Sequence, residues 1–425
     1  MLTVGFISEG VPYPGGSGGQ FVTWSLINYL IKHGCSVRLC VLLPKSEVDR
    51  WEANERRHME VLRHICSDVV LIGFESVVSS KSKLLDKIIS LPIYLSGYSQ
   101  FYPHESVKKN IVDFIEKDKP DVIYIFDTGP MIAMSDYKEV PRMVVPGDPL
   151  FEVLKYRISS LTLKERFQPN NILRWLRYLF MHRKLERLVI NKLRNYEWVG
   201  IYGDQHAKWL VQNGIDCNSL PIPVMAPKRR RILSAAPLHR TDKPVSILIF
   251  GRQNSTAGLT GVKLLVQEIL PILRKSVGKD RYQIHIAGAG GLPVAFEKEI
   301  RKANCVIHGE VEDMADVFIN SDIFLETSTY PVGVRTRIVT ALSFGMCVVA
   351  CSQSKMGISK LVNGENCLLG DTGCQIVDNL LRCVKDANLR EKLSANALKT
   401  YEATFDPEVA GKIVLREMKR LISVV

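Results

Sequence analysis

Apolar and polar residues follow one another along this chain in a pattern that predicts repeated strand–loop–helix units. In the clearest unit, a continuous apolar run at 322–325 predicts a buried strand, and a polar loop through Pro331 and Gly333 follows it. The apolar positions of the next segment recur at helical spacing: Val334, Ile338, Val339 and Leu342. Gly345 ends that helix, and 347–350 is a second buried strand. The pattern indicates part of a parallel α/β sheet.

The helix of this unit carries two arginines where a helix normally prefers negative charge. In such a unit the free backbone N–H groups of the helix N-terminus point to the edge of the sheet where anions bind. Arg335 and Arg337 stand in that first turn, and their charge is the wrong sign for the helix dipole. We therefore expect them to face a negatively charged ligand. Two solvated arginines on an exposed turn are the alternative.

The N-terminal part of the chain repeats the strand–loop–helix pattern with a glycine-rich loop. A buried strand at 2–8 leads into 9–20, which includes Gly18 and Gly19, and a helix ended by Gly34 follows. Glycines in such a loop let backbone amides approach a phosphate or a sugar closely. The loop is neither GxGxxG nor a Walker sequence, which disfavours ordinary dinucleotide binding and nucleotide hydrolysis. A flexible glycine turn is the alternative.

Two further strands of this half end in turns that contain aspartate. The runs 121–126 and 143–145 predict buried strands, followed by Asp127 and Asp148 respectively. Ligands of open α/β sheets bind beyond the carboxyl ends of the strands, so both carboxylates are candidates to face a cleft. Capping of a turn or helix is the alternative, and we favour it for Asp148. Asp127 remains a catalytic candidate.

From residue 245 the pattern starts again, which indicates a second domain. A chain of 425 residues exceeds the size at which a single core keeps growing. We expect an N-terminal Rossmann-like domain at 1–226, a proline-rich basic linker at 227–244 and a second Rossmann-like domain at 245–405. A final helix at 406–425 is expected to cross back to the first domain.

The second domain opens with a motif suited to a diphosphate. Gly251 and Arg252 come directly after the buried strand at 245–250. The planar guanidinium fork binds a diphosphate through two parallel hydrogen bonds. Arg252 is therefore a candidate ligand-binding residue.

Charge and cysteine usage narrow the set of partners and compartments. The net charge of +12 indicates acidic partners: nucleic acid, nucleotide phosphates or an anionic membrane surface. The basic, aromatic stretch that contains Arg174–Arg194 favours membrane contact, since no nucleic-acid-binding signature accompanies it. A second basic and apolar stretch, 81–102, fits a membrane interface and a core helix equally well. No apolar stretch reads as long enough to span a bilayer, and we expect a cytoplasmic protein, peripheral at the inner face of a membrane if the basic helix binds lipid.

Ten scattered cysteines without CxxC or His/Cys ligand spacing predict reduced thiols and no zinc site. No Asp-x-Asp carboxylate cluster is present either. We therefore expect no metal and no other cofactor.

The ordered set of motifs resembles glycosyltransferase family 4. The segment Gly-Val-Arg-Thr-Arg at 333–337, a helix and then Ala-Leu-Ser-Phe-Gly-Met-Cys-Val-Val-Ala at 341–350 resemble the donor-binding segment of that family. Arg252 matches the arginine of the family's Gly-Arg motif, and Ala257 stands where a lysine is usual. The family's two glutamates, eight residues apart, fall at Val332 and Thr340. The chain thus looks like a divergent member that lacks both glutamates.

This resemblance implies a GT-B architecture, α/β with two Rossmann-like domains facing across a cleft. It implies a retaining transferase that moves a sugar from a nucleotide-sugar donor to a glycan or lipid-linked acceptor, in cell-surface polysaccharide synthesis. The implied donor-binding residues are Gly18, Gly19, Gly251, Arg252, Gly333, Val334, Arg335, Arg337 and Thr340. The implied catalytic residues are Asp127, Arg252 and Arg337.

Three other classes of protein are alternatives to the transferase. A non-catalytic nucleotide-sugar-binding or scaffolding subunit is motivated by the two replaced glutamates. Another GT-B enzyme, such as a sugar-nucleotide epimerase, would need acid and base carboxylates in the cleft. An NAD-linked oxidoreductase is disfavoured, because no GxGxxG is followed by an acidic residue at the next strand end.

Overall fold

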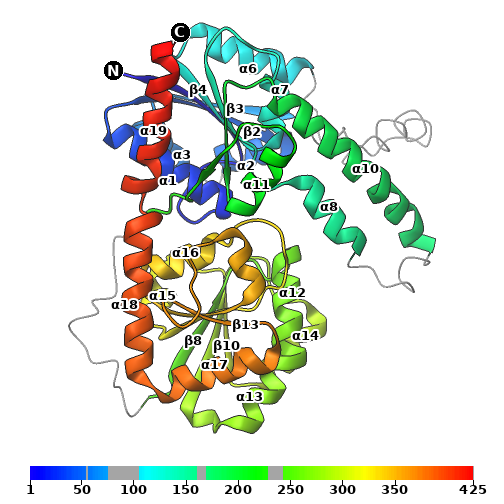
Figure 1. Ribbon diagram of the computed structural model, residues 1–425, viewed down its shortest axis with the longest axis vertical. Helices are drawn as coiled ribbons and strands as arrows, with labels where there is room; N and C mark the ends of the chain where they lie inside the picture. Colours follow the sequence, from blue (N-terminus) through cyan, green and yellow to red (C-terminus); the bar gives the residue numbers. More distant parts are fainter. Residues whose placement is uncertain (54–55, 75–104, 160–168, 228–242, 425) are drawn as a thin grey trace. The chain divides into compact units, whose positions relative to one another are not determined.

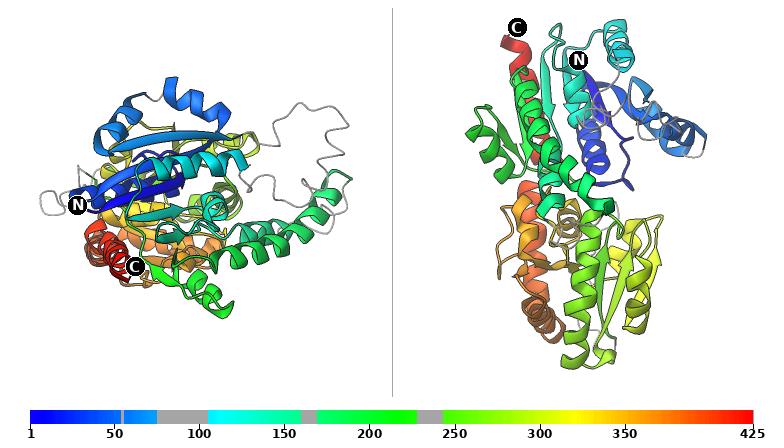
Figure 2. Two further views of the ribbon diagram at one scale, coloured as in Figure 1. Left: turned by 90° about the horizontal axis from the view of Figure 1, so that it is seen from above. Right: turned by 90° about the vertical axis from the view of Figure 1, so that its right-hand side faces the viewer.

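The computed structural model describes residues 1–53, 56–74, 105–159, 169–227 and 243–424. Contacts divide the chain into two compact units, Met1–Leu220 with Gly411–Val425 (unit 1) and Pro221–Ala410 (unit 2). Each unit is a parallel sheet with helices packed on both faces (Figure 1, Figure 2). The α/β class with two Rossmann-like units is therefore confirmed.

The change from unit 1 to unit 2 falls at Leu220–Pro221. Most of the expected linker, residues 228–242, lies outside the described part of the chain, and so does the stretch 81–102. Residues from Gly411 onward group with unit 1.

The unit 1 sheet has the order β3-β2-β1-β4-β5-β6-β7, and every adjacent pair is parallel. Its strands are β1 (Thr3–Glu9), β2 (Ser36–Pro44), β3 (Asp68–Phe74), β4 (Val122–Phe126), β5 (Arg142–Val145), β6 (Trp198–Tyr202) and β7 (Asn218–Leu220). All five residues of β4 are buried, as expected for a strand covered on both faces. The strand order reverses between β1 and β4, which is where ligands of such sheets bind.

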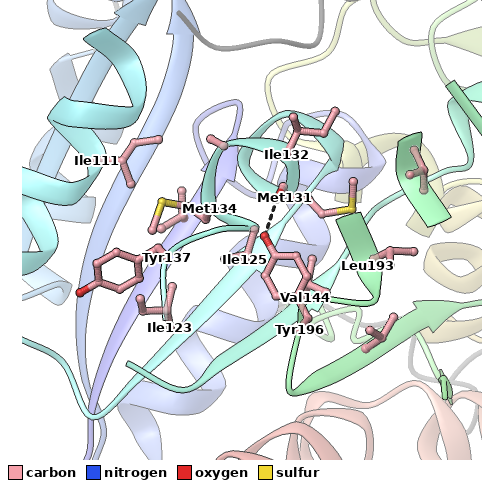
Figure 3. Close-up of a cluster of buried hydrophobic side chains, with 14 of the residues drawn as sticks. Ile111, Ile123, Ile125, Met131, Ile132, Met134, Tyr137, Val144, Leu193 and Tyr196 are labelled. Atoms are coloured by element: carbon pink, nitrogen blue, oxygen red, sulfur yellow. Dashed lines mark hydrogen bonds between the residues drawn. The ribbon is translucent and has the colours of Figure 1, made fainter. Parts of the chain in front are cut away.

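The helices of unit 1 are α1 (Gly18–Lys32), α2 (Lys45–Ala53), α3 (Arg56–Ile65), α6 (Glu105–Lys117), α7 (Thr128–Met134), α8 (Leu150–Ser159), α10 (Pro169–Leu193), α11 (Asp204–Gln212) and the part of α19 (Pro407–Val424) that follows Ala410. Figure 3 shows one core cluster, in which Ile111 of α6, Ile125 of β4 and Met131 of α7 pack together. The Tyr196 hydroxyl donates to the Met131 carbonyl at 2.5 Å, so this buried hydroxyl is satisfied.

A fully buried arginine ties three segments of unit 1 together. Arg142, the first residue of β5, forms an ion pair with Glu197, and its Nη2 lies 2.7 Å from Oε1 of that carboxylate. The guanidinium also donates to the carbonyls of Met134, Ser135 and Asn195. A buried charge is tolerated only when it is paired and hydrogen-bonded, and Arg142 meets both conditions.

We expect Glu197→Ala to lower the free energy of unfolding of unit 1 by about 3 kcal/mol, because it leaves a buried guanidinium without its counter-ion. The control is Glu139→Ala, which removes an exposed carboxylate lying 3.9 Å from Lys119 and should cost less than about 1 kcal/mol. Urea unfolding of the two variants measures both effects. Equal losses would show that the Arg142 pair is energetically unimportant.

The unit 2 sheet has the order β10-β9-β8-β11-β12-β13 and is also fully parallel. Its strands are β8 (Val245–Phe250), β9 (Tyr282–Ala287), β10 (Cys305–Gly309), β11 (Ile323–Glu326), β12 (Cys347–Cys351) and β13 (Leu368–Gly370). Its helices are α12 (Thr256–Leu264), η2 (Leu265–Ile269), α13 (Leu270–Ser276), η3 (Lys279–Arg281), α14 (Val294–Lys302), α15 (Met314–Ile319), α16 (Thr336–Ser343), η4 (Ser352–Gly357), α17 (Gly373–Lys385) and α18 (Ala387–Thr404). Here the order reverses between β8 and β11, and this edge carries the candidate site.

One helix among the described residues, Thr256–Ser276, is long and apolar enough to cross a membrane by length and composition alone. The sequence had indicated no such stretch, because Lys263 and Glu268 interrupt its apolar run. Five of its side chains belong to the apolar core of unit 2: Val262, Leu265, Ile269, Leu270 and Leu273. Glu268 accepts a hydrogen bond from the Gly373 N–H at 3.0 Å, at the start of α17. These contacts pack one face of the helix against the core of unit 2.

Candidate functional site

The candidate site of unit 2 is built around Gly251, whose backbone is in close contact with the Arg337 guanidinium. Gly251 follows β8 with φ +131°, a conformation that L side chains rarely adopt. A Cβ atom placed on Gly251 would lie 2.8 Å from Nη1 of Arg337. A Cβ on Gly288 would lie 2.3 Å from the Gly251 carbonyl oxygen. The turns after β8 and β9 therefore pack backbone against backbone, and the Arg337 guanidinium occupies the space that Gly251 leaves open.

Arg337 is held in place by a carboxylate from the neighbouring strand. Glu326, the last residue of β11, is 2% exposed and accepts hydrogen bonds from Nε and Nη2 of Arg337, the latter at 2.7 Å. It also accepts from the Ser328 N–H at 2.9 Å. Among the described residues, Nη1 of Arg337 has no hydrogen-bond acceptor. The pair therefore presents Nη1 above Gly251.

Glu326 was not among the sequence candidates. The signal that could have found it is the one that selected Asp127: an acidic residue at the carboxyl end of a buried strand.

The structure turns the Arg335 guanidinium into its own loop, and its contact with a ligand stays a prediction. Arg335 occupies the N-cap position of α16 and is 8% exposed. Its guanidinium donates to the carbonyls of Tyr330, Val332 and Gly333 and lies 5.5 Å from the centre of the Tyr330 ring. Arg335 therefore ties the 330–333 loop together from inside. These hydrogen bonds fix the position of its positive charge relative to the backbone of that loop.

The loop is also held from outside by the segment after β12. Gly333 has φ +77°, which glycine adopts without strain. A Cβ on Gly357 would lie 2.7 Å from the Val334 Cα, so the two backbones are in close contact. Gly333 and Val334 thus lie at the start of α16, the place that the sequence predicted for anion-binding amides.

Arg252 is exposed and stands next to Gly251 in the chain. Its carbonyl accepts from the Ser255 hydroxyl at 2.8 Å, and Ser255 in turn caps α12 by accepting from the Gly258 N–H at 3.0 Å. The capped turn fixes the backbone from which the Arg252 side chain extends. Arg252 and Arg337 are therefore the two arginines that the structure places at Gly251.

Val332 and Thr340 stand where the family resemblance places two glutamates, and neither offers a carboxylate or a free hydroxyl. The Thr340 side chain is buried, and its hydroxyl donates to the Thr336 carbonyl at 3.1 Å within α16. Val332 is buried as well. Thr340 as a donor-binding residue stays a prediction, and its hydroxyl is already used inside the helix.

In unit 1 the structure brings Asp127 together with Glu9, which the sequence reasoning did not single out. Asp127 follows β4 with φ +81° and is the one non-glycine residue with positive φ among those described. Such backbone strain persists where the surroundings enforce it, and it clusters at functional sites. Glu9 is the last residue of β1, and its Oε1 lies 1.7 Å from where a Cβ on Gly129 would be.

The two carboxyl groups influence each other's protonation. Although the Glu9 side chain reaches solvent, partial desolvation of its carboxyl raises its pKa from 4.5 to about 7, and a hydrogen bond from the Gly129 N–H opposes this. Desolvation, then the charge of Glu9 and then that of Asp148 raise the pKa of Asp127 well above its ordinary value. Asp148 is exposed on the loop after β5. The pair can therefore hold a proton near neutral pH.

Gly18 and Gly19 are the first two residues of α1, in unit 1. The Ser17 N–H before them donates to the Gln20 side chain at 2.8 Å. A Cβ on Gly19 would lie 3.3 Å from the Phe126 ring, so the start of α1 passes close to the end of β4. Within the described ranges, no three His, Cys, Asp or Glu side chains are grouped in a way that could hold a metal ion. The expectation of a metal-independent site stays a prediction.

We expect Gly251→Ala to weaken binding of a nucleoside diphosphate about 10-fold or more, because the new methyl group displaces the Arg337 guanidinium and strains the backbone at φ +131°. Calorimetric titration with UDP measures the change. Gly364→Ala is the control, since Gly364 also has positive φ but a Cβ there meets no atom within 4 Å. Unchanged UDP affinity in Gly251→Ala would show that the guanidinium position is not used.

Comparisons with known proteins agree with this fold. Residues 244–386 match the family model described as glycosyl transferases group 1. The sequence comparison with curated proteins finds no match. Three similar solved structures share the fold over nearly the whole of both chains.

The first is sucrose-phosphate synthase from Thermosynechococcus elongatus, with TM-score 0.65 and 13% identity over 100% of each chain. The second is Anabaena HepE in complex with UDP, with TM-score 0.63 and 13% identity over 99% of this chain and 100% of that one. The third is a mutant of S. aureus TarM in complex with fondaparinux, alpha-GlcNAc-glycerol and UDP, with TM-score 0.63 and 12% identity over 99% and 100%. The GT-B architecture is thus confirmed, and residues 244–386 resemble group 1 glycosyltransferases, which supports a glycosyltransferase.

Proposed function

We propose that this protein is a retaining glycosyltransferase that moves a sugar from a nucleotide sugar to a glycan or lipid-linked acceptor. The observation that carries the proposal is the pair of arginines at Gly251, at the carboxyl edge of the unit 2 sheet where the strand order reverses. Similar structures hold UDP or UDP-glucose, and one holds a sugar–glycerol compound. These ligands support the same donor class and a glycan acceptor here.

In this proposal the arginines act on the leaving group. Breaking the bond between the sugar and the diphosphate places negative charge on the departing oxygen. Arg252 and Nη1 of Arg337 donate to the diphosphate and stabilise that charge, so departure is favoured without a metal ion. Retention requires the acceptor hydroxyl to bond to the sugar carbon on the face that the diphosphate leaves.

Asp127 is the residue we assign to the acceptor hydroxyl or the reacting sugar. When ionised, it accepts a hydrogen bond from a hydroxyl group, and as the acceptor attacks, that proton passes to the carboxyl group or to the departing diphosphate. The strained backbone at φ +81° supports this role, because it holds the carboxyl at the switch point of the unit 1 sheet.

We further propose that the protein is a divergent member of family 4 that works in cell-surface polysaccharide synthesis at the cytoplasmic face of a membrane. The net charge of +12 supports contact with anionic lipid, and so does α10. The second half of α10 buries Leu185, Val189 and Leu193 while Arg183 and Lys184 are exposed. The side chains of Arg174 and Arg177 lie outside the described part of the structure.

Replacing Arg174, Arg177 and Arg183 together by glutamine is expected to abolish binding to vesicles of anionic phospholipid at about 0.1 M salt, because each arginine near the surface contributes roughly 1 kcal/mol. Co-sedimentation with vesicles measures this. Replacement of Arg301, Lys302 and Lys298 on α14 removes the same charge elsewhere and is the control. Retained vesicle binding in the α10 variant would contradict the membrane proposal.

The experiment that tests the transferase proposal is a panel of UDP-, GDP-, ADP- and CMP-sugars without added metal. Thermal stabilisation by one of them identifies the donor class. NMR of the product with that donor then reports the anomeric configuration, which should match that of the donor. Inversion of configuration would contradict retention, and hydrolysis or epimerisation without transfer would favour another GT-B enzyme.

A non-catalytic nucleotide-sugar-binding subunit is the second candidate. It is favoured by one observation: both glutamate positions of the family motif are occupied by buried side chains, Val332 and Thr340. Binding of a nucleotide sugar without turnover toward any acceptor would support this subunit. Turnover would exclude it.

A further inference from the structure

We propose that Glu326 is a positioning residue that holds the Arg337 guanidinium in the orientation in which Nη1 binds the diphosphate of the donor. This inference rests on the proposed function. Glu326 is not one of the donor-motif positions that the family resemblance implies. It assigns to one buried carboxylate the alignment of the cationic group at Gly251.

The first support is that the nitrogens of the Arg337 guanidinium face two different sides. Nε and Nη2 of Arg337 both donate to Glu326, which is the side-on, two-bond arrangement that fixes the plane of a guanidinium. Nη1 remains on the opposite side and lies 2.8 Å from where a Cβ on Gly251 would be. The ion pair therefore decides which nitrogen faces the open backbone of Gly251.

The second support is that the carboxylate is buried and hydrogen-bonded to its own strand end. Glu326 is 2% exposed, whereas the Arg337 side chain is 18% exposed. Its Oε1 accepts from the Ser328 N–H at 2.9 Å, so it is anchored to its own strand end as well. The Ser328 carbonyl accepts a hydrogen bond from the Ser354 hydroxyl. The Ser328 hydroxyl lies 3.3 Å from the Thr260 hydroxyl. A buried and anchored carboxylate supports a partially exposed arginine, and not the reverse.

Two physical effects of Glu326 on donor binding have opposite signs. Its negative charge repels the diphosphate and weakens binding. Its hydrogen bonds hold a long, flexible side chain in one rotamer before the ligand arrives, which strengthens binding. We expect the second effect to be the larger one, so removal of the Glu326 charge should weaken UDP binding.

The central test is Glu326→Gln, which keeps the shape and removes the charge. The glutamine amide places N–H groups against the arginine donors, so the two hydrogen bonds from Nε and Nη2 of Arg337 can no longer form together. We expect UDP affinity to fall about 10-fold, and kcat/KM for the sugar nucleotide to fall with it. Unchanged or tighter UDP binding would overturn the proposal, because repulsion would then be the main effect of this carboxylate.

A double-mutant cycle separates positioning from a general structural role. If Glu326 acts through Arg337, adding Glu326→Gln to Arg337→Ala causes no further loss of UDP affinity. An additive loss would show that Glu326 acts by another route, and this outcome would also overturn the proposal. The exposed Glu312→Gln is the matched control and should bind UDP like the unmodified protein.

Arg337→Lys keeps the proposal testable if Glu326→Gln does not fold. Lysine keeps the positive charge but cannot form the two-bond fork with Glu326. We expect it to bind UDP nearly as weakly as Arg337→Ala. Full affinity in Arg337→Lys would show that alignment by Glu326 is not needed. If the unmodified protein binds no nucleotide of the UDP, GDP, ADP and CMP series, the proposed function fails together with this inference, whereas normal binding in the variants overturns only the inference.

Discussion

Arg337→Ala is expected to lower kcat/KM for the sugar nucleotide about 10²–10³-fold, the usual cost of removing one donor to a developing negative charge. The variant removes Nη1 from above Gly251 and leaves the buried Glu326 carboxylate without its partner. Both consequences oppose the departure of a diphosphate. Loss of the ion pair also destabilises unit 2, so folding is checked by circular dichroism at the assay temperature.

Arg252→Ala provides the comparison that separates charge at the site from stability of the fold. Arg252 is exposed, and the hydrogen bonds of its segment are made by its carbonyl, so its truncation should leave stability nearly unchanged. We expect a similar loss of kcat/KM, about 10²-fold. Arg301→Ala removes an exposed arginine in the last turn of α14 and should have no effect. Normal kinetics in both Arg252→Ala and Arg337→Ala would contradict the assignment of this site.

Asp127→Asn is expected to lower turnover and, above neutral pH, to raise the stability of the fold. The substitution removes the charge that Glu9 and Asp148 disfavour, while asparagine keeps the size and shape of aspartate at this strained position. If Asp127 contacts the reacting groups, turnover should fall about 10²-fold or more. A single substitution that raises stability and lowers activity is typical of a strained functional site.

The pH dependence follows from the direction of the pKa shifts. The folded state holds its protons on Glu9 and Asp127 at higher pH than the unfolded chain does, because both folded pKa values are raised. Stability from this pair is therefore fully present below about pH 4 and is lost as pH rises through about 7, the folded pKa of Glu9. In Asp127→Asn the loss between pH 5 and pH 8 should be smaller.

Thermal unfolding at pH 5 and pH 8 measures this difference. Asp113→Asn, a substitution of an exposed aspartate on α6, is the matched control and should leave the pH dependence unchanged. Equal pH dependence in the unmodified protein and Asp127→Asn would show that the carboxyl pair does not share a proton. Full activity in Asp127→Asn would remove Asp127 from the catalytic residues.

The periodicity of the chain was sufficient to predict the α/β class and the repeated units. Strands of parallel sheets are covered on both faces, so they appear as continuous apolar runs, and β4, β11 and β12 were all recognised in this way. The same reasoning predicted that Asp127, Gly251 and Arg252 follow strand ends, because ligands of such sheets bind beyond those ends. These are local properties of a sequence, and each element carries its own signal.

Only the tertiary structure decided where the charged side chains point. Arg335 and Arg337 are two residues apart and look alike in the sequence, yet one guanidinium is turned into its own loop and the other is held by Glu326 at the end of β11. Glu9 and Asp127 are paired because β1 and β4 are neighbours, although 118 positions separate the two residues in the chain. The direction of a long side chain depends on which acceptors the fold brings within reach, and for these two arginines the acceptors lie in the 330–333 loop and at the end of β11. The local sequence therefore determined the elements and the strand ends, and tertiary packing determined how the charged side chains are oriented and paired.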